Sequence, residues 1–292
     1  MYSQITSNKR QSVALMMVFI LIIIGLGYLF DISSGLGNYG GVLFAVGFSF
    51  GMTLISYFKG DKIALWSTGA KPITKEENAY LYRMVENLCI TSGLPAPKIY
   101  IIEDSAINAL ATGRNPETAT IAVTRGALEQ LTNEELEGVL AHELSHVQNY
   151  DIRFMTLVVV LVGAISMLSN IFFHTIRSSR RNRDNGNAGV ILMIVGLFFG
   201  ILAPVVAEII KLAISRRREY LADASGSLLT RYPEGLAKAL EKIAAQNQPM
   251  IKADTATAHL FFANPFSGKK FASFFSTHPP IEDRIKKLRE MA

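Results

Sequence analysis

The sequence predicts a mainly α-helical protein with a small β-sheet, an α+β fold, that crosses a membrane several times. Half of its 292 residues are hydrophobic and only 18% are charged, which is more apolar than an ordinary soluble enzyme. The apolar residues gather in four long uncharged runs, and a capped helix and two β-branched runs lie between the second and the third. We therefore expect four transmembrane helices and a folded domain outside the bilayer.

Each of the four apolar runs is long enough to span a membrane, because about 20 helical residues cross a hydrocarbon core of about 30 Å. The first run follows Lys9 and Arg10. It is too long for the apolar core of a signal peptide and has no clear cleavage site, so we interpret it as a retained anchor. The predicted spans are residues 12–30, 39–58, 154–173 and 189–213.

These spans divide the chain into four parts. Residues 1–58 form an N-terminal transmembrane hairpin, and residues 154–213 form a second one. Residues 59–153 and 214–292 then build one domain outside the membrane from two pieces of the chain.

The first of these pieces contains a helix and two short strands. The helix is expected over Glu76–Ser92. Residues rich in β-branched side chains predict strands at Lys98–Ile102 and Thr118–Val123. Asn108–Gly113 lies between them, and we interpret it as a polar turn that leads toward an edge of the sheet.

A second helix of this piece begins after Thr132. Thr132 is followed three positions later by Glu135, which is the pattern of a capping box. Glu134 and Glu137 add negative charge near the positive end of the helix dipole. An apolar stripe at helical spacing then consists of Leu136, Val139, Leu140, Leu144 and Val147.

This helix carries the string His142-Glu143-Leu144-Ser145-His146. Because residues four apart lie on one face of a helix, both imidazoles can reach one Zn²⁺. Glu143 then points toward the open side of the metal, where its carboxylate can take a proton from an attacking water molecule. With only five histidines in the chain, the string is rare by chance and predicts a catalytic zinc site. The alternative is a surface helix with two incidental histidines.

A catalytic zinc site needs a third protein ligand, and the best candidate is Glu219. Glu219 and Asp223 are four residues apart in the segment Ser215–Asp223, so on a helix both can face the first helix. Glu219 completes a set of two histidines and one glutamate. Asp223 is expected to accept the free ring N–H of a ligand histidine, with His142 as the first choice. Without the partner helix, Glu219 is simply a solvated glutamate.

The predicted ligands lie on both sides of the second hairpin, so the chain between them must cross the membrane an even number of times. The third apolar run begins eight residues after His146, which places the metal within one or two helical turns of the membrane surface. Lys9 and Arg10 precede the first span, and Lys59 and Lys62 follow the second. The positive-inside tendency therefore places the N-terminus and the zinc domain in the cytoplasm.

Two features of the second hairpin leave alternatives open. Its loop, His174–Ala188, carries four arginines and one aspartate, although a spanning hairpin places this loop outside. Either the positive-inside tendency is overridden or the hairpin does not fully span, and we favour the spanning hairpin. Glu208 is an intramembrane acid and hence a functional candidate, but an ion pair with Lys211 is the simpler interpretation.

Charge and cysteine content argue against other classes of protein. The net charge of +5 is modest, and the basic residues cluster beside the apolar runs, where they meet anionic lipid head groups. We therefore expect no nucleic-acid partner. Cys89 is the single cysteine, so no intramolecular disulfide forms, and no pattern supports a cysteine nucleophile.

The order of four segments resembles the HtpX-type membrane zinc endopeptidases, which are relatives of the membrane CAAX prenyl protease. The segments are His142–His146 with Asn149 and Asp151, Ser215–Asp223, Asn108–Gly113, and Ser276-Thr277-His278-Pro279-Pro280. The resemblance covers nearly the whole chain. It departs at Leu110, where the family more often has phenylalanine.

The resemblance implies a multi-pass protein of the bacterial plasma membrane. It also implies that the catalytic domain is zincin-like and lies in the cytoplasm. It implies that Asn108 and Ala109 line the cleft, where an extended peptide adds as a strand and Asn108 binds its backbone. A turn asparagine is the alternative. It also implies that His278 donates to the oxyanion, whereas its position alone indicates a capping or surface histidine. Gln246–Phe266, the least regular segment, is interpreted as a flap over the cleft.

The sequence thus predicts a membrane zinc endopeptidase that cleaves membrane proteins at the cytoplasmic face. His142, His146 and Glu219 bind one Zn²⁺, and Glu143 is the general base. The resemblance adds damaged or misassembled membrane proteins as substrates, a role in quality control and stress response, and self-cleavage. Two alternatives stay open: a protease that trims prenylated or signal-like peptides, and a non-enzymatic zinc-binding membrane scaffold.

Overall fold

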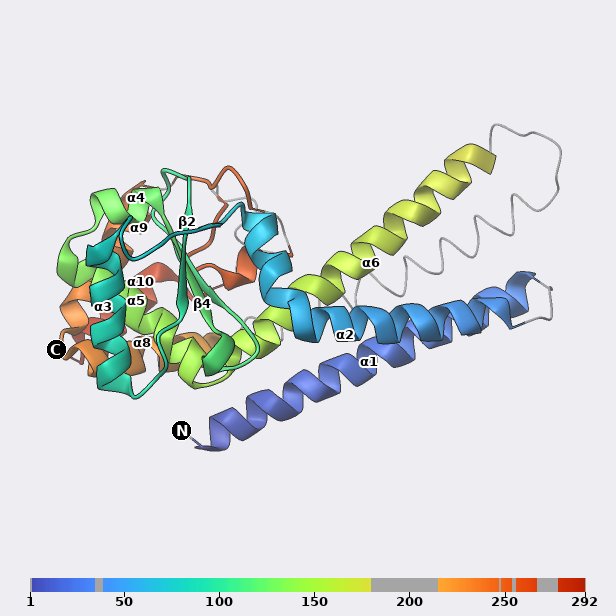
Figure 1. Ribbon diagram of the computed structural model, residues 1–292, viewed down its shortest axis with the longest axis horizontal. Coiled ribbons are helices and arrows are strands. Elements are labelled where there is room, and N and C mark those ends of the chain that lie inside the picture. Colours follow the sequence, from blue (N-terminus) through green and yellow to red (C-terminus); the bar gives the residue numbers. More distant parts are fainter. Residues whose placement is uncertain are drawn as a thin grey trace.

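The computed structural model describes residues 2–34, 39–179, 215–246, 248–253, 256–266 and 278–291. Over these ranges the chain is mainly helical with one small mixed sheet, so this part of the predicted fold class is confirmed. Figure 1 shows a long arm of helices that extends from a domain in which helices surround the sheet.

The arm consists of α1 (Tyr2–Ser34), α2 (Gly40–Thr68) and α6 (Asp151–Ser179) (Figure 1). Within the described ranges, these three helices are long and apolar enough to cross a membrane. They extend beyond the uncharged runs, and α2 continues ten residues past Phe58. The fourth predicted span, residues 189–213, lies outside the described residues, as does Glu208.

The surface of the arm fits a lipid environment. Large apolar side chains are exposed along it, among them Leu21 of α1 and Leu43 and Leu54 of α2, each more than half exposed. Exposed apolar surface of this extent is typical of a membrane-facing region. The described helices of the arm therefore match three of the four spans expected from the sequence.

Helices α1 and α2 form a tight hairpin. The carboxylate of Asp31 in α1 accepts the backbone N–H groups of Gly41 and Val42 at 2.8 and 2.9 Å, at the positive end of α2. A Cβ on Gly27 would lie only 2.5 Å from the carbonyl oxygen of Gly41. Glycine at this crossing therefore allows the two backbones to approach closely.

The sheet has the strand order β1-β2-β4-β3. The central strands β2 (Lys98–Ile102) and β4 (Thr120–Thr124) are parallel. β1 (Lys71–Pro72) and β3 (Ala109–Thr112) flank them as antiparallel edge strands. Strand β2 lies where it was predicted. β4 begins two residues later than predicted because a 3₁₀ turn, η1 (Pro116–Thr118), precedes it.

The prediction that Asn108–Gly113 forms a turn is wrong. Residues Ala109–Thr112 form β3, which pairs with β4 from Ala109–Val123 to Thr112–Thr120. All four residues of this strand are buried. The segment has few β-branched side chains, so its extended conformation depends on pairing with β4 rather than on local propensity.

Helices pack around the sheet and build the core together with it. The helix predicted from Glu76 begins three residues later, because the side chain of Asn78 caps it by accepting the N–H of Leu81. In the helix that carries the histidines, the carboxylate of Glu135 accepts the N–H of Thr132 at 2.7 Å, as the capping-box pattern predicts. The helices are α3 (Ala79–Ser92), α4 (Arg125–Gln130), α5 (Asn133–Gln148), α8 (Arg216–Thr230), α9 (Pro233–Gln246) and α10 (Ile281–Arg289).

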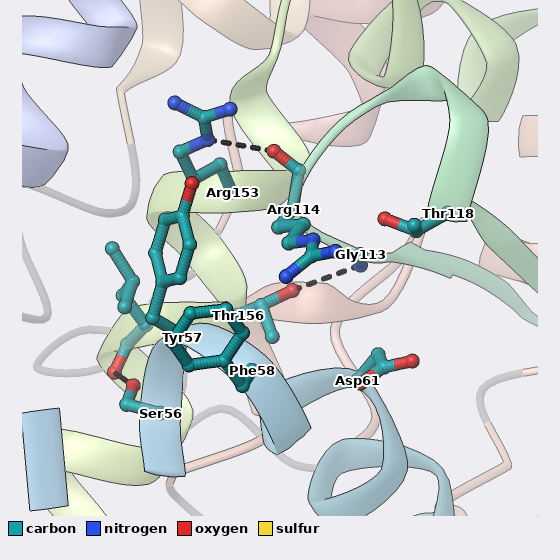
Figure 2. A pocket seen from close by; sticks show the side chains of 10 residues that line it. Ser56, Tyr57, Phe58, Asp61, Gly113, Arg114, Thr118, Arg153 and Thr156 are labelled. Atoms are coloured by element: carbon teal, nitrogen blue, oxygen red, sulfur yellow. Dashed lines mark hydrogen bonds between the residues drawn. The ribbon is translucent and has the colours of Figure 1, made fainter. Parts of the chain in front are cut away.

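The arm and the domain meet at a cavity of about 90 Å³, shown in Figure 2. Beside it, the hydroxyl of Thr156 in α6 accepts the N–H of Gly113 at 3.2 Å and bonds the hydroxyl of Thr112 at 2.8 Å. Arg153 of α6 donates to the carbonyl of Arg114 at 2.6 Å. These bonds tie the end of β3 to a candidate membrane helix.

Candidate active site

Two helices carry the predicted metal ligands, and they pack against each other at a glycine. His142, Glu143 and His146 lie on α5, and Glu219 lies on α8. A Cβ on Gly226 of α8 would lie 2.9 Å from the backbone nitrogen of His142. Gly226 therefore allows α8 to approach closely enough for Glu219 to reach both histidines.

His142, His146 and Glu219 form a possible metal site, in which one ligand atom from each lies within 4.8 Å of the other two. The two Nε2 atoms are 3.1 Å apart, and the oxygens of Glu219 lie 3.8 Å from the Nε2 of His142 and 3.6 Å from that of His146. Ligands of a tetrahedral zinc ion are separated by about 3.3 Å, so these atoms suit the ion. Glu219 Oε2 is buried without a hydrogen-bond partner in the described structure.

Carboxylates orient both imidazole rings. Asp223 lies 2.9 Å from Nδ1 of His142, which the sequence analysis gave as the first choice for its partner. Asp151 lies 3.0 Å from Nδ1 of His146. With each Nδ1 engaged, both Nε2 atoms are directed toward Glu219, which is the usual arrangement of carboxylate, histidine and zinc.

The pKa values of the two rings are shifted in opposite directions. Burial lowers the pKa of His142 to about 3. Burial also lowers the pKa of His146, but its bond to Asp151 and the charge of Glu219 outweigh burial and raise the pKa to about 9. The two Nε2 atoms are 3.1 Å apart, so a metal ion bound by both requires His146 to lose its proton.

Glu143 lies in the site with a strongly altered acidity. It is only 2% exposed, and burial, followed by the charge of Glu219, raises its pKa to about 7. The nearby backbone N–H of Ala111 in β3 acts in the opposite direction and lowers the pKa in part. A carboxyl group with this pKa exchanges its proton readily near neutral pH.

His278 also lies at the metal site. Its Nε2 is 3.6 Å from Glu219 Oε2, and its side chain is 7% exposed. Burial and then the charge of Arg284 hold its pKa well below the ordinary value, so the ring is neutral. A neutral imidazole at this position can present an N–H group to a reacting oxygen.

Asn108 and Ala109 bind another part of the chain. The side-chain amide of Asn108 donates to the carbonyl of Ala263 at 3.0 Å and accepts its N–H at 3.1 Å. The carbonyl of Ala109 accepts the N–H of Phe262 at 2.8 Å, and Leu110 forms an antiparallel bridge with Phe261. The outer edge of β3, where a peptide was expected to add, is thus paired with residues 261–263.

This pairing segment belongs to the region interpreted as a flap. It follows η2 (Ala258–Leu260), and residues 258–263 are all buried. The ring of Phe262 packs edge-on against His142 with centroids 4.9 Å apart. The described residues of the flap therefore cover β3 beside the metal site.

Sequence reasoning missed Arg284, which is fully buried behind the site. Its guanidinium binds both carboxylate oxygens of Asp223, donates to the carbonyl of Phe262 at 3.1 Å and lies 3.9 Å from Glu219. It lies in α10 within the apolar stripe of residues 281, 285 and 288. A charged residue on a buried helix face indicates a buried ion pair, and this signal was available in the sequence.

Asp151 was also missed, although it lies in the motif on which the resemblance was based. It begins α6, only five residues after His146, and it is 1% exposed. No spacing within a single helix joins it to His146, because the chain bends between α5 and α6. Its contact with His146 therefore follows from the tertiary structure.

Comparisons with known proteins agree with this geometry. The model of peptidase family M48 matches residues 75–292. Proteins of Thermoanaerobacter pseudethanolicus and Tropheryma whipplei, each described as a protease HtpX homolog, are 44% identical to this chain over its full length and over 98% of their own. The crystal structure of S. mikatae Ste24p shares the fold, with a TM-score of 0.55 at 19% identity over 99% of this chain and 67% of that one. The chain therefore belongs to peptidase family M48 and is a membrane-associated metalloprotease of the HtpX type.

Proposed function

We propose that this metalloprotease is a zinc endopeptidase that cleaves membrane proteins where their segments emerge at the cytoplasmic face. One observation carries the proposal. His142, His146 and Glu219 converge beside Glu143, immediately next to a helix that is apolar enough to cross a membrane.

Two histidines and one glutamate are a typical ligand set for catalytic zinc. When bound, zinc polarises the scissile carbonyl and lowers the pKa of water. His142, His146 and Glu219 would hold the ion, and Asp223 and Asp151 would keep the two rings in position. Zinc is the proposal here because these ligands and the M48 family both suit it.

Glu143 is the proposed general base and acid. With its pKa raised to about 7, it can take a proton from the attacking water and pass that proton to the leaving amine. Its carboxylate is carried by α5 and lies near the Ala111 N–H of β3. His278, neutral and close to Glu219, donates its N–H to the oxygen that gains negative charge during the attack.

The substrate is proposed to lie along β3. An extended peptide would replace residues 261–263 on this edge and bind the backbone at Ala109, as a strand added to the sheet. The amide of Asn108, released from Ala263, would then bind the peptide backbone. Substrate binding therefore requires that residues 261–263 move away from β3.

The cytoplasmic side is proposed from charge and position. Lys9 and Arg10 lie at the start of the first candidate span, and the positive-inside tendency places this end in the cytoplasm. The relatives named above are bacterial, so we place the enzyme as a multi-pass protein in a bacterial plasma membrane. Degradation of damaged membrane proteins, including under stress, and self-cleavage complete the proposal.

The direct test is Glu143→Gln in the full-length protein purified in detergent. This variant should retain one zinc ion per chain and lose cleavage of a membrane-protein substrate by at least about 100-fold. Glu137→Gln, on the same helix but partly exposed, is the matched control and should cleave normally. Retained cleavage in Glu143→Gln would remove Glu143 as the base, and zinc-free wild-type protein would overturn the metal site.

Sequencing of the cleavage products tests the proposed role. Scattered cuts in an unfolded membrane protein agree with quality control. A single cut near one terminus indicates a processing protease instead. Stoichiometric zinc without cleavage of any peptide would indicate a scaffold.

A further inference from the structure

We infer that Asn8 of α1 is a positioning residue for the metal site, an inference that rests on the proposed function. Asn8 lies near the start of the first candidate membrane span, yet it is only 3% exposed. Its side-chain amide donates to the carboxylate of Asp151 at 2.6 Å. Asp151 in turn binds Nδ1 of His146 at 3.0 Å. A chain of two hydrogen bonds thus leads from the membrane arm to a proposed zinc ligand.

Asn8 holds both sides of the bend between α5 and α6. Helix α5 ends at Gln148 and α6 begins at Asp151, and Tyr150 between them adopts a left-handed conformation with φ of 61°. Besides Asp151, the amide of Asn8 donates to the carbonyl of Asn149 at 2.8 Å. The direction of the Asp151 carboxylate, and with it the ring of His146, therefore depends on α1.

The chemistry of this contact suits a positioning role. The amide of Asn8 has two N–H groups and donates to two acceptors, while Asp151 receives Asn8 on Oδ1 and His146 on Oδ2. Asp151 is 1% exposed, and a buried carboxylate needs such donors. Because asparagine is uncharged, it fixes Asp151 without neutralising the charge that acts on His146. A lysine at this position would compete with the histidine for that charge.

Loss of this contact should weaken metal retention. Partners that orient a ligand typically change metal affinity by 10–100-fold. Asn8 acts through Asp151, so we expect an effect of about tenfold, at the lower end of that range. The first membrane helix then contributes to the metal site as well as anchoring the protein.

The test measures zinc retention by full-length protein in the Glu143→Gln background, which prevents self-cleavage. The half-life of zinc transfer to a chromogenic chelator should fall about tenfold in Asn8→Ala. Gln11→Ala is the matched control, because Gln11 is exposed on the same helix and, among the residues that the structure describes, its amide bonds the hydroxyl of Ser7 at 3.2 Å. Its half-life should stay at the value of the background protein.

A swapped pair separates positioning from general destabilisation. Asn8→Asp sets two carboxylates against each other and should release zinc fastest. In Asn8→Asp with Asp151→Asn, the new amide at position 151 can donate to the new carboxylate at position 8 and still accept the N–H of His146. This double variant should recover much of the half-life that Asn8→Asp loses.

Three results would overturn the inference. In the first, Asn8→Ala keeps zinc as long as Gln11→Ala does. In the second, the swapped pair has the same zinc half-life as Asn8→Asp. In the third, Asn8→Ala lowers the melting temperature but leaves the zinc half-life of the folded protein unchanged. Zinc-free wild-type protein would instead overturn the proposed function, so the two failures are distinguishable.

Discussion

Arg284 binds Asp223 through two parallel hydrogen bonds, with Nη2–Oδ1 at 2.7 Å and Nε–Oδ2 at 2.9 Å. Arg284 is fully buried and Asp223 is 2% exposed. Oδ1 of the same carboxylate lies 2.9 Å from Nδ1 of His142. The orientation of this proposed zinc ligand therefore depends on a buried ion pair between α8 and α10.

Arg284→Met should strongly destabilise the protein, because it leaves Asp223 buried without its counter-charge. Breaking a buried ion pair in this way costs about 3–5 kcal/mol. Thermal unfolding of the zinc-free protein measures this loss. Arg289→Met, on the same helix but 46% exposed beside Glu234, should cost less than about 1 kcal/mol.

Replacing both partners separates stability from metal binding. Arg284→Met with Asp223→Leu removes both charges, and such replacements of a buried pair are often neutral. The double variant should regain most of the stability but hold zinc poorly, because His142 has lost its carboxylate. Full zinc retention in this variant would show that Asp223 does not position His142.

Gly226→Ala should separate α8 from α5 and disrupt the metal site. The new Cβ would lie 2.9 Å from the nitrogen of His142, where the backbone cannot give way cheaply. Overpacking of this kind costs about 1–3 kcal/mol, and it should move Glu219, two helical turns away on α8, from the histidines. Zinc content and the melting temperature measure both effects. Gly51→Ala meets no atom of the described residues within 4 Å and should leave both unchanged.

The stability of the zinc-free protein should depend on pH through Glu143. Burial raises its pKa from 4.5 to about 7, so between these values the folded state holds a proton that the unfolded chain has lost. The contribution of Glu143 to the free energy of unfolding therefore falls as the pH rises through this window, whereas His142, with its pKa lowered to about 3, contributes in the opposite direction below pH 6.5. At about 1.4 kcal/mol per pKa unit, the full effect is about 3 kcal/mol.

Glu143→Gln removes the contribution of Glu143, and comparison with the wild type isolates it from the contributions of the histidines. Without zinc, it should unfold at the same temperature as the wild type near pH 4.5 and at a higher temperature above pH 7. Melting curves of chelator-treated protein across this range give the comparison. Glu137→Gln should follow the wild type throughout. Parallel curves for Glu143→Gln and the wild type would show that Glu143 titrates normally.

A disulfide between β3 and the segment that pairs with it should block peptide cleavage. Leu110 and Phe261 face each other in an antiparallel bridge without hydrogen bonds between the two residues. In this geometry the two backbone segments lie close enough for cysteines at these positions to form a disulfide. Oxidised Leu110→Cys with Phe261→Cys should retain zinc and lose at least about 90% of its peptide cleavage, because the substrate adds to this same edge. A reductant should restore cleavage.

The two single cysteine variants are the controls for this experiment. Each single cysteine variant, treated with the same oxidant, reports the cost of losing the large buried side chain. Cys89 is buried, and burial raises its pKa to about 11, so it should not interfere. Full cleavage by the oxidised double variant would place the substrate away from β3.

Sequence reasoning located the groups whose arrangement is local. A spacing of four residues on a helix is enough to bring His142 beside His146 and to set Glu219 one turn before Asp223. The capping box at Thr132 and the strand at Lys98–Ile102 are likewise encoded by neighbouring residues. Long uncharged runs also suffice to locate three candidate membrane helices within the described ranges.

The groups that were missed depend on contacts between distant segments. Strand β3 consists mostly of small residues, and it is extended because it pairs with β4. The bond between Asn8 and Asp151 joins positions 143 apart, which no periodic pattern encodes. Asn108 was placed at the cleft from family likeness, whereas its side chain is bound to Ala263. Arg284 alone left a local trace, as a charge within an apolar stripe.

The proposed metal site and the residues that surround it come from parts of the chain that leave the ribosome at very different times. Asn8 is made first, the two histidines follow much later, and Glu219 and Arg284 come only after another membrane helix has been made. A nascent chain that has exposed its histidines still lacks the third ligand. The three proposed ligands should therefore be unable to hold a metal ion together until synthesis is nearly finished.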